Sequence, residues 1–355
     1  MAAGATSHEF THQNGTYEVL MYQPWAVAIQ TVTLTITTLF VITGNIVCFL
    51  VLMRTRDGNE VTRLCMLSLT ATDIGVGFLV CIPITGATAV NYWPYGDAFC
   101  LGVAGGTILL SLGGIFVVAV NVERYVAIVW PLRSVTYVTI PRARFALGMV
   151  WIVGGIFCGM YCFLPGRKAV YHPHFHTCFV DPEDPEKKDV FGVMAAWIFA
   201  IVPFLTTLIL YSHLYLIARR HARQISVMEV GHLNNRRVIK KSDLKTATTF
   251  FIITAVLAFS WLPFSTVICY EGLTRHEAHP LITFTSEILL LSNSYWNIVI
   301  YYFRNEKFRQ AGRKSVRQCF RRGGRSRDNE IEATSRVVGE LPHSGNQRVV
   351  ITPHF

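Results

Sequence analysis

Seven long stretches with almost no charged side chain limit what this chain can fold into. An α-helix rises about 1.5 Å per residue, so roughly 20 apolar residues cross the ~30 Å hydrocarbon core of a bilayer. Each stretch is at least that long. Five contain no Asp, Glu, Lys or Arg, and two contain one acid each, Asp73 or Glu287. The stretches are residues 19–53, 64–96, 98–122, 145–166, 190–218, 246–270 and 278–303.

The stretches predict an all-α membrane protein built as a bundle of seven transmembrane helices. Of the 355 residues, 52% are hydrophobic and only 15% are charged, which excludes an ordinary soluble domain of this length. Only short polar segments separate the stretches, so we expect one domain. Its predicted parts are an extracellular N-terminus (1–25), the seven-transmembrane domain (26–303), an amphipathic interfacial helix (304–320) and a disordered cytoplasmic tail (321–355).

The distribution of cations predicts the orientation. With the N-terminus outside, 27 of the 32 Lys and Arg residues lie on the cytoplasmic side, the usual bias of membrane proteins. We therefore expect a multi-pass protein of the cell membrane with a cytoplasmic C-terminus. The net charge of +10 then faces anionic lipid and cytoplasm rather than nucleic acid. The five cations in predicted outer loops are Arg167, Lys168, Lys187, Lys188 and Arg275.

Three covalent modifications follow from this orientation. Asn14 and Thr16 form a glycosylation sequon on the outer side. Cys100 and Cys178 both lie on the oxidising side, and we expect a disulfide between them. Cys319 follows a basic amphipathic stretch and is a palmitoylation candidate, with a free thiol in a solvated basic tail as the alternative.

Polar side chains are costly in hydrocarbon, so those that a span retains are candidates for function. Asp73 lies mid-span, and Asn45 lies near it if the first two helices run antiparallel. Asn293, Ser294 and Asn297 form a polar cluster at the matching depth of the last span. These oxygens can hold a proton or a small hard cation such as sodium. The alternative is a hydrogen-bond network without an ion. We expect no other cofactor.

The residues Glu123, Arg124 and Tyr125 end the third span, and here the chain resembles a known family. Their order and position are similar to the E/DRY motif of rhodopsin-like (class A) G-protein-coupled receptors. Further similarities follow in the family's order along the chain. They are Gly44 and Asn45, Leu69 to Asp73, Trp93 to Gly96, Trp151, Pro203 with Tyr211, Ser260 to Pro263 (CWxP), and Asn297 to Tyr301 (NPxxY).

The resemblance implies that Arg124 is the conformational switch. Asp243 lies twenty residues before Pro263, at the predicted inner end of helix 6. A guanidinium can pair with both Glu123 and Asp243 at rest, and outward movement of helix 6 would break the second pair. The alternative is that Asp243 is a solvated residue near the start of the helix. The residues assigned to the switch and to G-protein coupling are Glu123, Arg124, Tyr125, Tyr211, Asp243, Asn297 and Tyr301.

Residues Ser260 to Pro263 of helix 6 also resemble the family's CWxP motif, the conformational toggle. Pro263 removes a backbone hydrogen bond and favours a kink that can pivot. Trp261 is the bulky side chain placed to couple a ligand to that pivot. Helix 7 departs from the family, because Ile298 stands where NPxxY has proline, which puts the local unwinding of this helix in doubt.

The ligand is not evident from the resemblance, since within the family the chain is only loosely similar to the amine, adenosine and melatonin branch and its orphan receptors. Amine receptors anchor a cation on an Asp of helix 3, where this chain has Gly106 or Thr107, so a conventional monoamine is disfavoured. Glu287 could bind a cationic ligand instead, or pair with a base such as Arg167, Lys168 or Arg275. The alternative ligand is neutral or lipid-like. The ligand-binding candidates are Gly106, Thr107, Trp197, Phe264, Ile268 and Glu287.

Three histidines alternate in the second outer loop, as His172, His174 and His176. Period two would place them on one face of a strand, where zinc binding or a response to pH is one reading. The other is plain surface polarity, and we assign no metal site.

The function predicted from the sequence is a receptor that binds an extracellular small ligand and activates heterotrimeric G proteins. Arrestin and receptor kinases are further expected partners. A channel or transporter is the rival, although no repeat or pore-lining polar ring is evident. No nucleophile–base pair or phosphate-binding loop supports an enzyme.

Overall fold

A computed structural model describes residues 23–54, 60–184, 190–227, 234–274, 276–304, 309–310 and 312–313, with the backbone alone at 191, 196, 218–227, 234–251, 253–254, 301 and 304. The predictions for Asn14, Cys319, most of 304–320 and the tail 321–355 lie outside these residues. The helices are α2 (Pro24–Arg54), α3 (Glu60–Val76), α4 (Ile82–Val90), α5 (Asp97–Gly106), α6 (Ile108–Val129), α7 (Pro131–Tyr137), α8 (Ile140–Phe163), α9 (Val190–Val227), α10 (Asn234–Thr274) and α11 (Pro280–Arg304).

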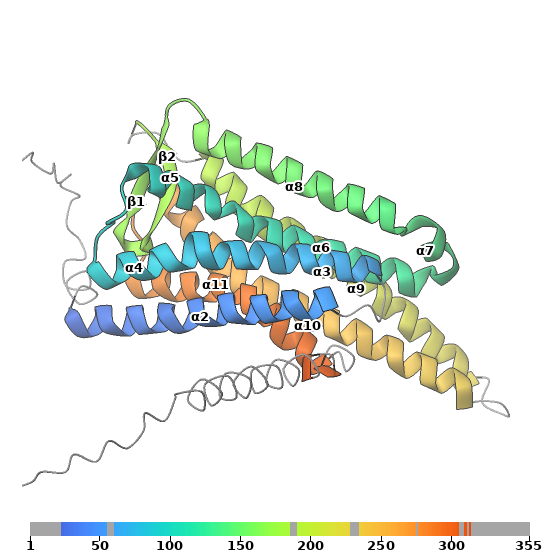
Figure 1. Cartoon of the computed structure of the whole chain (residues 1–355). Coiled ribbons are helices and arrows are strands. Elements are labelled where there is room, and N and C mark those ends of the chain that lie inside the picture. Colours follow the sequence, from blue (N-terminus) through green and yellow to red (C-terminus); the bar gives the residue numbers. More distant parts are fainter. Residues whose placement is uncertain are drawn as a thin grey trace, which may run out of the picture.

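The described helices form a bundle of seven rods (Figure 1). A π-helical segment η1 (Gly77–Cys81) joins α3 to α4 in the second rod, and α5 continues into α6 as the third. Within the described residues, six rods are long and apolar enough to cross a membrane, and α11 packs between α10 and α2 as the seventh. The all-α bundle predicted from the sequence is confirmed.

Large apolar side chains lie on the outside of the bundle as well as in its core. Trp25, Ile29 and Phe40 of α2 are each more than half exposed, and α8 buries only Leu147 and Gly154. In water such faces would drive association, whereas hydrocarbon solvates them. The exposed apolar surface therefore agrees with a bundle surrounded by lipid.

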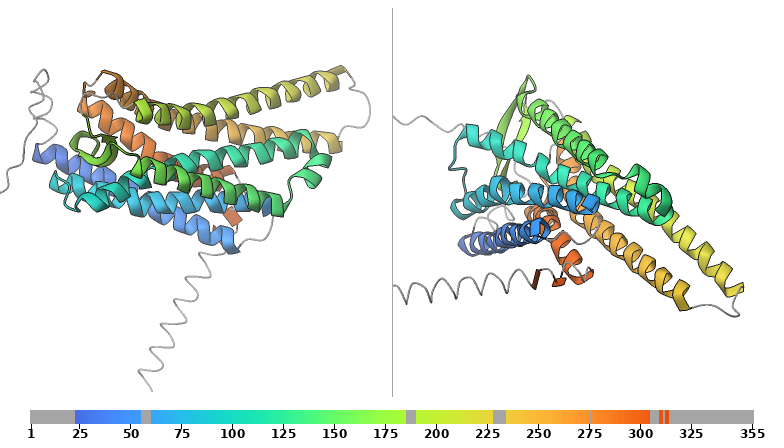
Figure 2. Two further views of the ribbon diagram at one scale, coloured as in Figure 1. Left: turned by 90° about the horizontal axis from the view of Figure 1, so that it is seen from above. Right: turned by 45° about the vertical axis from the view of Figure 1, so that its right-hand side comes forward.

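A two-stranded antiparallel hairpin covers one end of the bundle (Figure 1). Its strands are β1 (Arg167–His172) and β2 (Thr177–Pro182), joined through the 3₁₀ turn η2 (Pro173–Phe175). The predicted disulfide between Cys100 and Cys178 is present and ties β2 to α5. We call this end the hairpin end, and the end that carries Arg124 the Arg124 end. At the Arg124 end, α9 and α10 extend past the other helices (Figures 1 and 2).

The hairpin corrects the prediction for the three histidines. Only His172 lies in a strand, because Pro173 begins η2, which contains His174, and His176 adopts a left-handed backbone with φ 51°. The three side chains therefore do not share a strand face. The alternative prediction, that these histidines are simply polar surface residues, also fails for two of them. The side chains of His174 and His176 are only 12% and 7% exposed.

Glycine lets α8 approach α6 closely. A Cβ added at Gly154 would lie 2.5 Å from a methyl carbon of Leu112, whereas one added at the neighbouring Gly155 would meet nothing within 4 Å. Gly105 of the third rod allows a similar approach, because a Cβ added there would lie 2.9 Å from Sγ of Cys162. For Gly105 and Gly154, close helix approach is the observed role.

Substitution at this pair of neighbours tests the packing. We expect Gly154→Ala to destabilise the protein by about 1–3 kcal/mol, because the methyl group must displace Leu112. Gly155→Ala is the matched control, with a gain of up to about 1 kcal/mol in helix propensity. Thermal unfolding of the purified full chain measures both. Equal melting temperatures for the two variants would contradict the close approach.

Candidate functional site

The Arg124 end contains a buried carboxylate held by two helices. Glu123 is 5% exposed, and its Oε2 accepts a hydrogen bond of 2.8 Å from the Thr62 hydroxyl of α3. The same oxygen lies 3.3 Å from Nε of Arg124. Two partners compensate much of the cost of burying the charge. Thr62 was not identified from the sequence, because a threonine beside a predicted span carries no distinctive signal.

A hydrogen-bond chain joins α6 to α9 one turn before Arg124. The Tyr211 hydroxyl donates to Oδ1 of Asn121 at 3.3 Å, and Nδ2 of Asn121 donates to the Thr207 hydroxyl at 3.4 Å. Thr207 in turn donates to the carbonyl of Pro203 at 2.7 Å. In this conformation the Tyr211 hydroxyl therefore forms a hydrogen bond with Asn121. Asn121 was missed from the sequence, although an amide inside a charge-free span is a signal that could have found it.

Tyr125 provides a second tie between the same two helices. Its hydroxyl lies 2.5 Å from Nδ1 of His213, and its ring meets Trp130 edge to face at 5.8 Å. The remaining residues assigned to the switch, Asp243 and Tyr301, have side chains outside the described ones. The structure thus brings Glu123 and Arg124 together with α3, α6 and α9 at the Arg124 end.

The polar cluster in the middle of the bundle draws on three helices. Nδ2 of Asn45 donates to the carbonyl of Ser294 at 3.0 Å, which links α2 to α11. Ser294 and Asn297 face the carboxylate of Asp73. Four buried atoms of these residues have no hydrogen-bond partner in the described structure. They are Oδ1 of Asn45, Oδ2 of Asp73, Oγ of Ser294 and Nδ2 of Asn297.

A buried cation site needs oxygen atoms that are free to act as ligands, and the unpartnered oxygens of Asn45, Asp73 and Ser294 meet this need. Carboxylate, amide and hydroxyl oxygens are the ligands that hard cations prefer. Asn293 is also buried, at 3% exposure, in the same helix. The chemistry of these oxygens therefore fits the ligand preferences of a small hard cation such as sodium.

The toggle residues lie in the core of α10. Trp261 is 6% exposed and its indole Nε1 has no hydrogen-bond partner, while Pro263 lies within the helix. Helix α11 continues through Ile298 as a regular α-helix to Arg304. The side chain of Ile298 packs 3.0 Å from the position of a Cβ on Gly44, so isoleucine fills the interface with α2.

At the hairpin end, the turn between the strands enters the bundle. Phe175 is 2% exposed, and its ring meets Phe264 of α10 at 5.7 Å. Nδ1 of His176 lies 3.8 Å from Oε2 of Glu287, and both Glu287 oxygens lack a hydrogen-bond partner. The base that faces Glu287 is therefore His176. Arg167 instead donates to the carbonyl of Val180.

The other ligand-binding candidates are dispersed. A Cβ on Gly106 would lie 3.2 Å from Val80, so this position contacts η1, and the Thr107 hydroxyl donates to the carbonyl of Ala104. Trp197 is 41% exposed on α9. Phe264 and Ile268 are half-buried in α10. Phe264 and Glu287 lie against the inserted turn, through Phe175 and His176.

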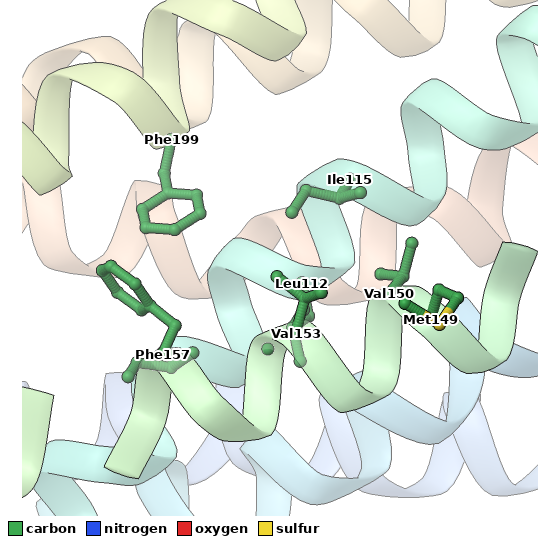
Figure 3. Close-up of a pocket in the computed structure, with 9 residues that line it drawn as sticks. Leu112, Ile115, Met149, Val150, Val153, Phe157 and Phe199 are labelled. Atoms are coloured by element: carbon green, nitrogen blue, oxygen red, sulfur yellow. The ribbon is translucent and has the colours of Figure 1, made fainter. Parts of the chain in front are cut away.

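A cavity of about 290 Å³ lies between α6, α8 and α9 (Figure 3). Its lining is entirely apolar, and the rings of Phe157 and Phe199 close one side. The sequence did not predict a cavity here. The lining residues are Ile108, Leu112, Ile115, Met149, Val150, Val153, Gly154, Phe157 and Phe199.

No group of three or more His, Cys, Asp or Glu able to hold a metal ion occurs within the described part of the chain. His172 and His174 each pair with a carboxylate instead, Asp181 at 2.5 Å and Glu271 at 3.0 Å. Zinc binding by the three loop histidines therefore has no structural support.

Comparison with known proteins agrees with this geometry. Residues 44–301 match the family described as 7 transmembrane receptor (rhodopsin family). The chain is 30% identical to the adenosine receptor A2a of Homo sapiens over 81% of this chain and 71% of that receptor. It is 28% identical to the galanin receptor type 1 of Homo sapiens over 85% of each. It is 25% identical to the histamine H2 receptor of Rattus norvegicus over 84% of this chain and 82% of that receptor.

The Asn121 chain predicts energetic coupling between α6 and α9. We expect Asn121→Ala to cost about 1–3 kcal/mol, because two buried hydrogen bonds are lost. In a Tyr211→Phe background the same change should cost less, since one of the bonds is already absent. Thermal melting of the four proteins gives the coupling energy. Strictly additive effects would show that the two side chains do not stabilise each other.

Proposed function

Because the chain belongs to the rhodopsin family of seven-transmembrane, G-protein-coupled receptors, which are not enzymes, we propose that it binds an extracellular small ligand at the hairpin end. Binding activates heterotrimeric G proteins by outward movement of the Arg124 end of α10. The observation that supports this is the pair of buried charged groups at opposite ends of one bundle. Glu287 lies beside the inserted turn, and Glu123 with Arg124 lies at the other end.

The protein is a multi-pass membrane protein, and we place its hairpin end outside the cell. The split of 27 cytoplasmic to five outer cations supports this orientation. A disulfide at the hairpin end is also consistent with the oxidising side. Glycosylation of Asn14 and palmitoylation of Cys319 belong to the same proposal.

The switch works through the charge that Arg124 carries. At rest the guanidinium pairs with Glu123, and Tyr211 is engaged by Asn121. Movement of α10 would release Asp243 from Arg124, and Tyr211 and Tyr301 would then receive the freed guanidinium. A ligand needs only to favour the open arrangement by its differential affinity for the two states. Arrestin and receptor kinases would bind the same opened end.

Two ligand classes have support from different observations. Glu287 is a buried carboxylate without a hydrogen bond, which favours a ligand with a cationic group. The apolar cavity beside Phe157 and Phe199 favours a neutral, lipid-like ligand that reaches the protein from the bilayer. The relatives are named for adenosine, histamine and galanin, three unlike ligands, so their names do not select between the classes.

A sodium ion would be held by the polar cluster of Asn45, Asp73, Ser294 and Asn297, with Asn293 beside it. Bound there, the ion would supply positive charge to a buried carboxylate and stabilise the conformation in which these helices are close. We expect a higher melting temperature in sodium chloride than in choline chloride, and no such difference for Asp73→Asn. A salt effect that persists unchanged in that variant would exclude the site.

The function is tested by a G-protein dissociation panel in cells, first without ligand and then with a metabolite library. We expect at least one G-protein family to respond, Asp243→Ala to raise the ligand-free signal, and Arg124→Ala to reduce the response. No response of any G protein under any condition would overturn the proposal.

The same panel separates the ligand classes. An active compound is retested on Glu287→Gln, which removes the charge and keeps the shape. We expect a cationic agonist to lose potency by tenfold or more, since each factor of ten in affinity corresponds to about 1.4 kcal/mol. A neutral agonist should be unaffected.

A further inference from the structure

The inserted turn of the hairpin contacts carboxylates from several elements, all through histidine. Nε2 of His174 lies 3.0 Å from Oε2 of Glu271, at the end of α10, and its Nδ1 lies 3.8 Å from Oε1 of Glu277, in the segment before α11. His176 faces Glu287 of α11 in the same way, at 3.8 Å. The hairpin is thus connected to both helices that flank this segment.

The geometry at His174 favours a protonated ring. A neutral imidazole has one N–H donor and one acceptor nitrogen, so either tautomer would leave a lone pair facing a carboxylate. Only the imidazolium form can donate a hydrogen bond to Glu271 and also place its second N–H at an ion-pair distance of 3.8 Å from Glu277. Glu271 is also held in place, because its Oε1 accepts a hydrogen bond of 3.0 Å from the backbone N–H of Ala278.

The electrostatic surroundings agree with this geometry. Burial opposes protonation of His174, but the hydrogen bond and charge of Glu271, with the charges of Glu277 and Glu287, outweigh it and raise the pKa of His174 above its usual value. On the hairpin itself, His172 pairs with Asp181 at 2.5 Å. The side chain of Glu277 is 58% exposed, so protons can reach the cluster from solvent.

We propose that His174, Glu271 and Glu277, with His176 and Glu287 beside them, form an extracellular proton-binding site through which acidity regulates the receptor. Protonation holds the hairpin turn against α10 and α11, and loss of the proton loosens it. The extracellular placement rests on the proposed function; the proton site itself does not.

The contact reaches the core of α10 through aromatic rings. His174 meets Phe175 at 4.5 Å between ring centres, and Phe175 meets Phe264 at 5.7 Å. Phe264 lies three residues after Trp261, on neighbouring turns of the same helix face. A change in how tightly the turn is held therefore acts on the segment of α10 that contains the toggle.

The sign of the pH dependence follows from the raised pKa. Stabilisation by the protonated ring is fully present below the pKa of the unfolded chain, about 6.5, and is lost as pH rises through the higher pKa of the folded protein. The melting temperature should therefore fall as pH rises from about 6 to about 8. The site's contribution to that fall should be about 1–2 °C for a chain of 355 residues.

The experiment measures thermal unfolding of the purified full chain, with its disulfide intact, at pH 6 and pH 8. We expect wild type to melt higher at pH 6, and His174→Gln and Glu271→Gln to lose this difference. His276→Gln is the matched control, because His276 is an exposed histidine of the same end and should leave the difference unchanged. Two different partners are substituted, so a folding defect in one variant leaves the other informative.

A pH dependence that is equal in wild type and both variants would overturn the proton site. The regulatory part is tested by ligand-free G-protein activation in cells at the same two pH values. We expect a pH-dependent signal in wild type and His276→Gln that is absent in His174→Gln. A signal that is present but independent of pH would overturn the regulation, whereas absence of any signal at any pH would count against the proposed function instead.

Discussion

Hydrocarbon offers no hydrogen-bonding partner, so the polar groups inside this bundle must find partners within the protein. Backbone groups do so by forming helices, and hydroxyls do so by bonding to carbonyls of the preceding turn, as Thr207 does to Pro203. The exceptions identify the places where the protein can respond to something. Asp73 and Glu287 are buried carboxylates with unpartnered oxygens, and one lies in mid-bundle while the other lies under the hairpin. Each is costly unless a cation or proton approaches it.

The two ends of the bundle are connected by packed helices rather than by a chain of charges. At the hairpin end, Phe175 and the histidines contact α10 and α11 directly. At the Arg124 end, α6 and α9 are tied by Asn121 with Tyr211 and by Tyr125 with His213. Helix α10 contacts α9 and α11 along the bundle. Its position is therefore sensitive to both ends, which is the physical requirement for a receptor that transmits a signal across a membrane.

Much of the fold could be predicted because the thickness of the membrane sets the minimum length of an apolar helix that crosses it, and stretches of that length are visible in one sequence. The seven helical rods and the disulfide between Cys100 and Cys178 followed from charge-free lengths and from the cation distribution, and the structure contains them, six of the rods being long and apolar enough to span a membrane. The histidine strand was wrong, because Pro173 ends β1 and the left-handed residue His176 reverses the chain. The period-two spacing of the histidines predicts neither the end of the strand at Pro173 nor the reversal at His176. The sequence left open whether Glu287 meets a cationic ligand or an outer-loop base, and it did not single out His176, since the path of the loop decides which base reaches the helix.

The sequence by itself determined the class of protein, the number of spans and the Glu123–Arg124 pair, because hydrophobic length and adjacent motif residues are local properties. Only the tertiary structure decided that Asn121 engages Tyr211 and that His174 faces two carboxylates at once. These contacts depend on the rotation of each helix about its axis and on the course of the hairpin. Both are set by packing among residues far apart in the chain, such as Gly154 against Leu112 and Ile298 against Gly44.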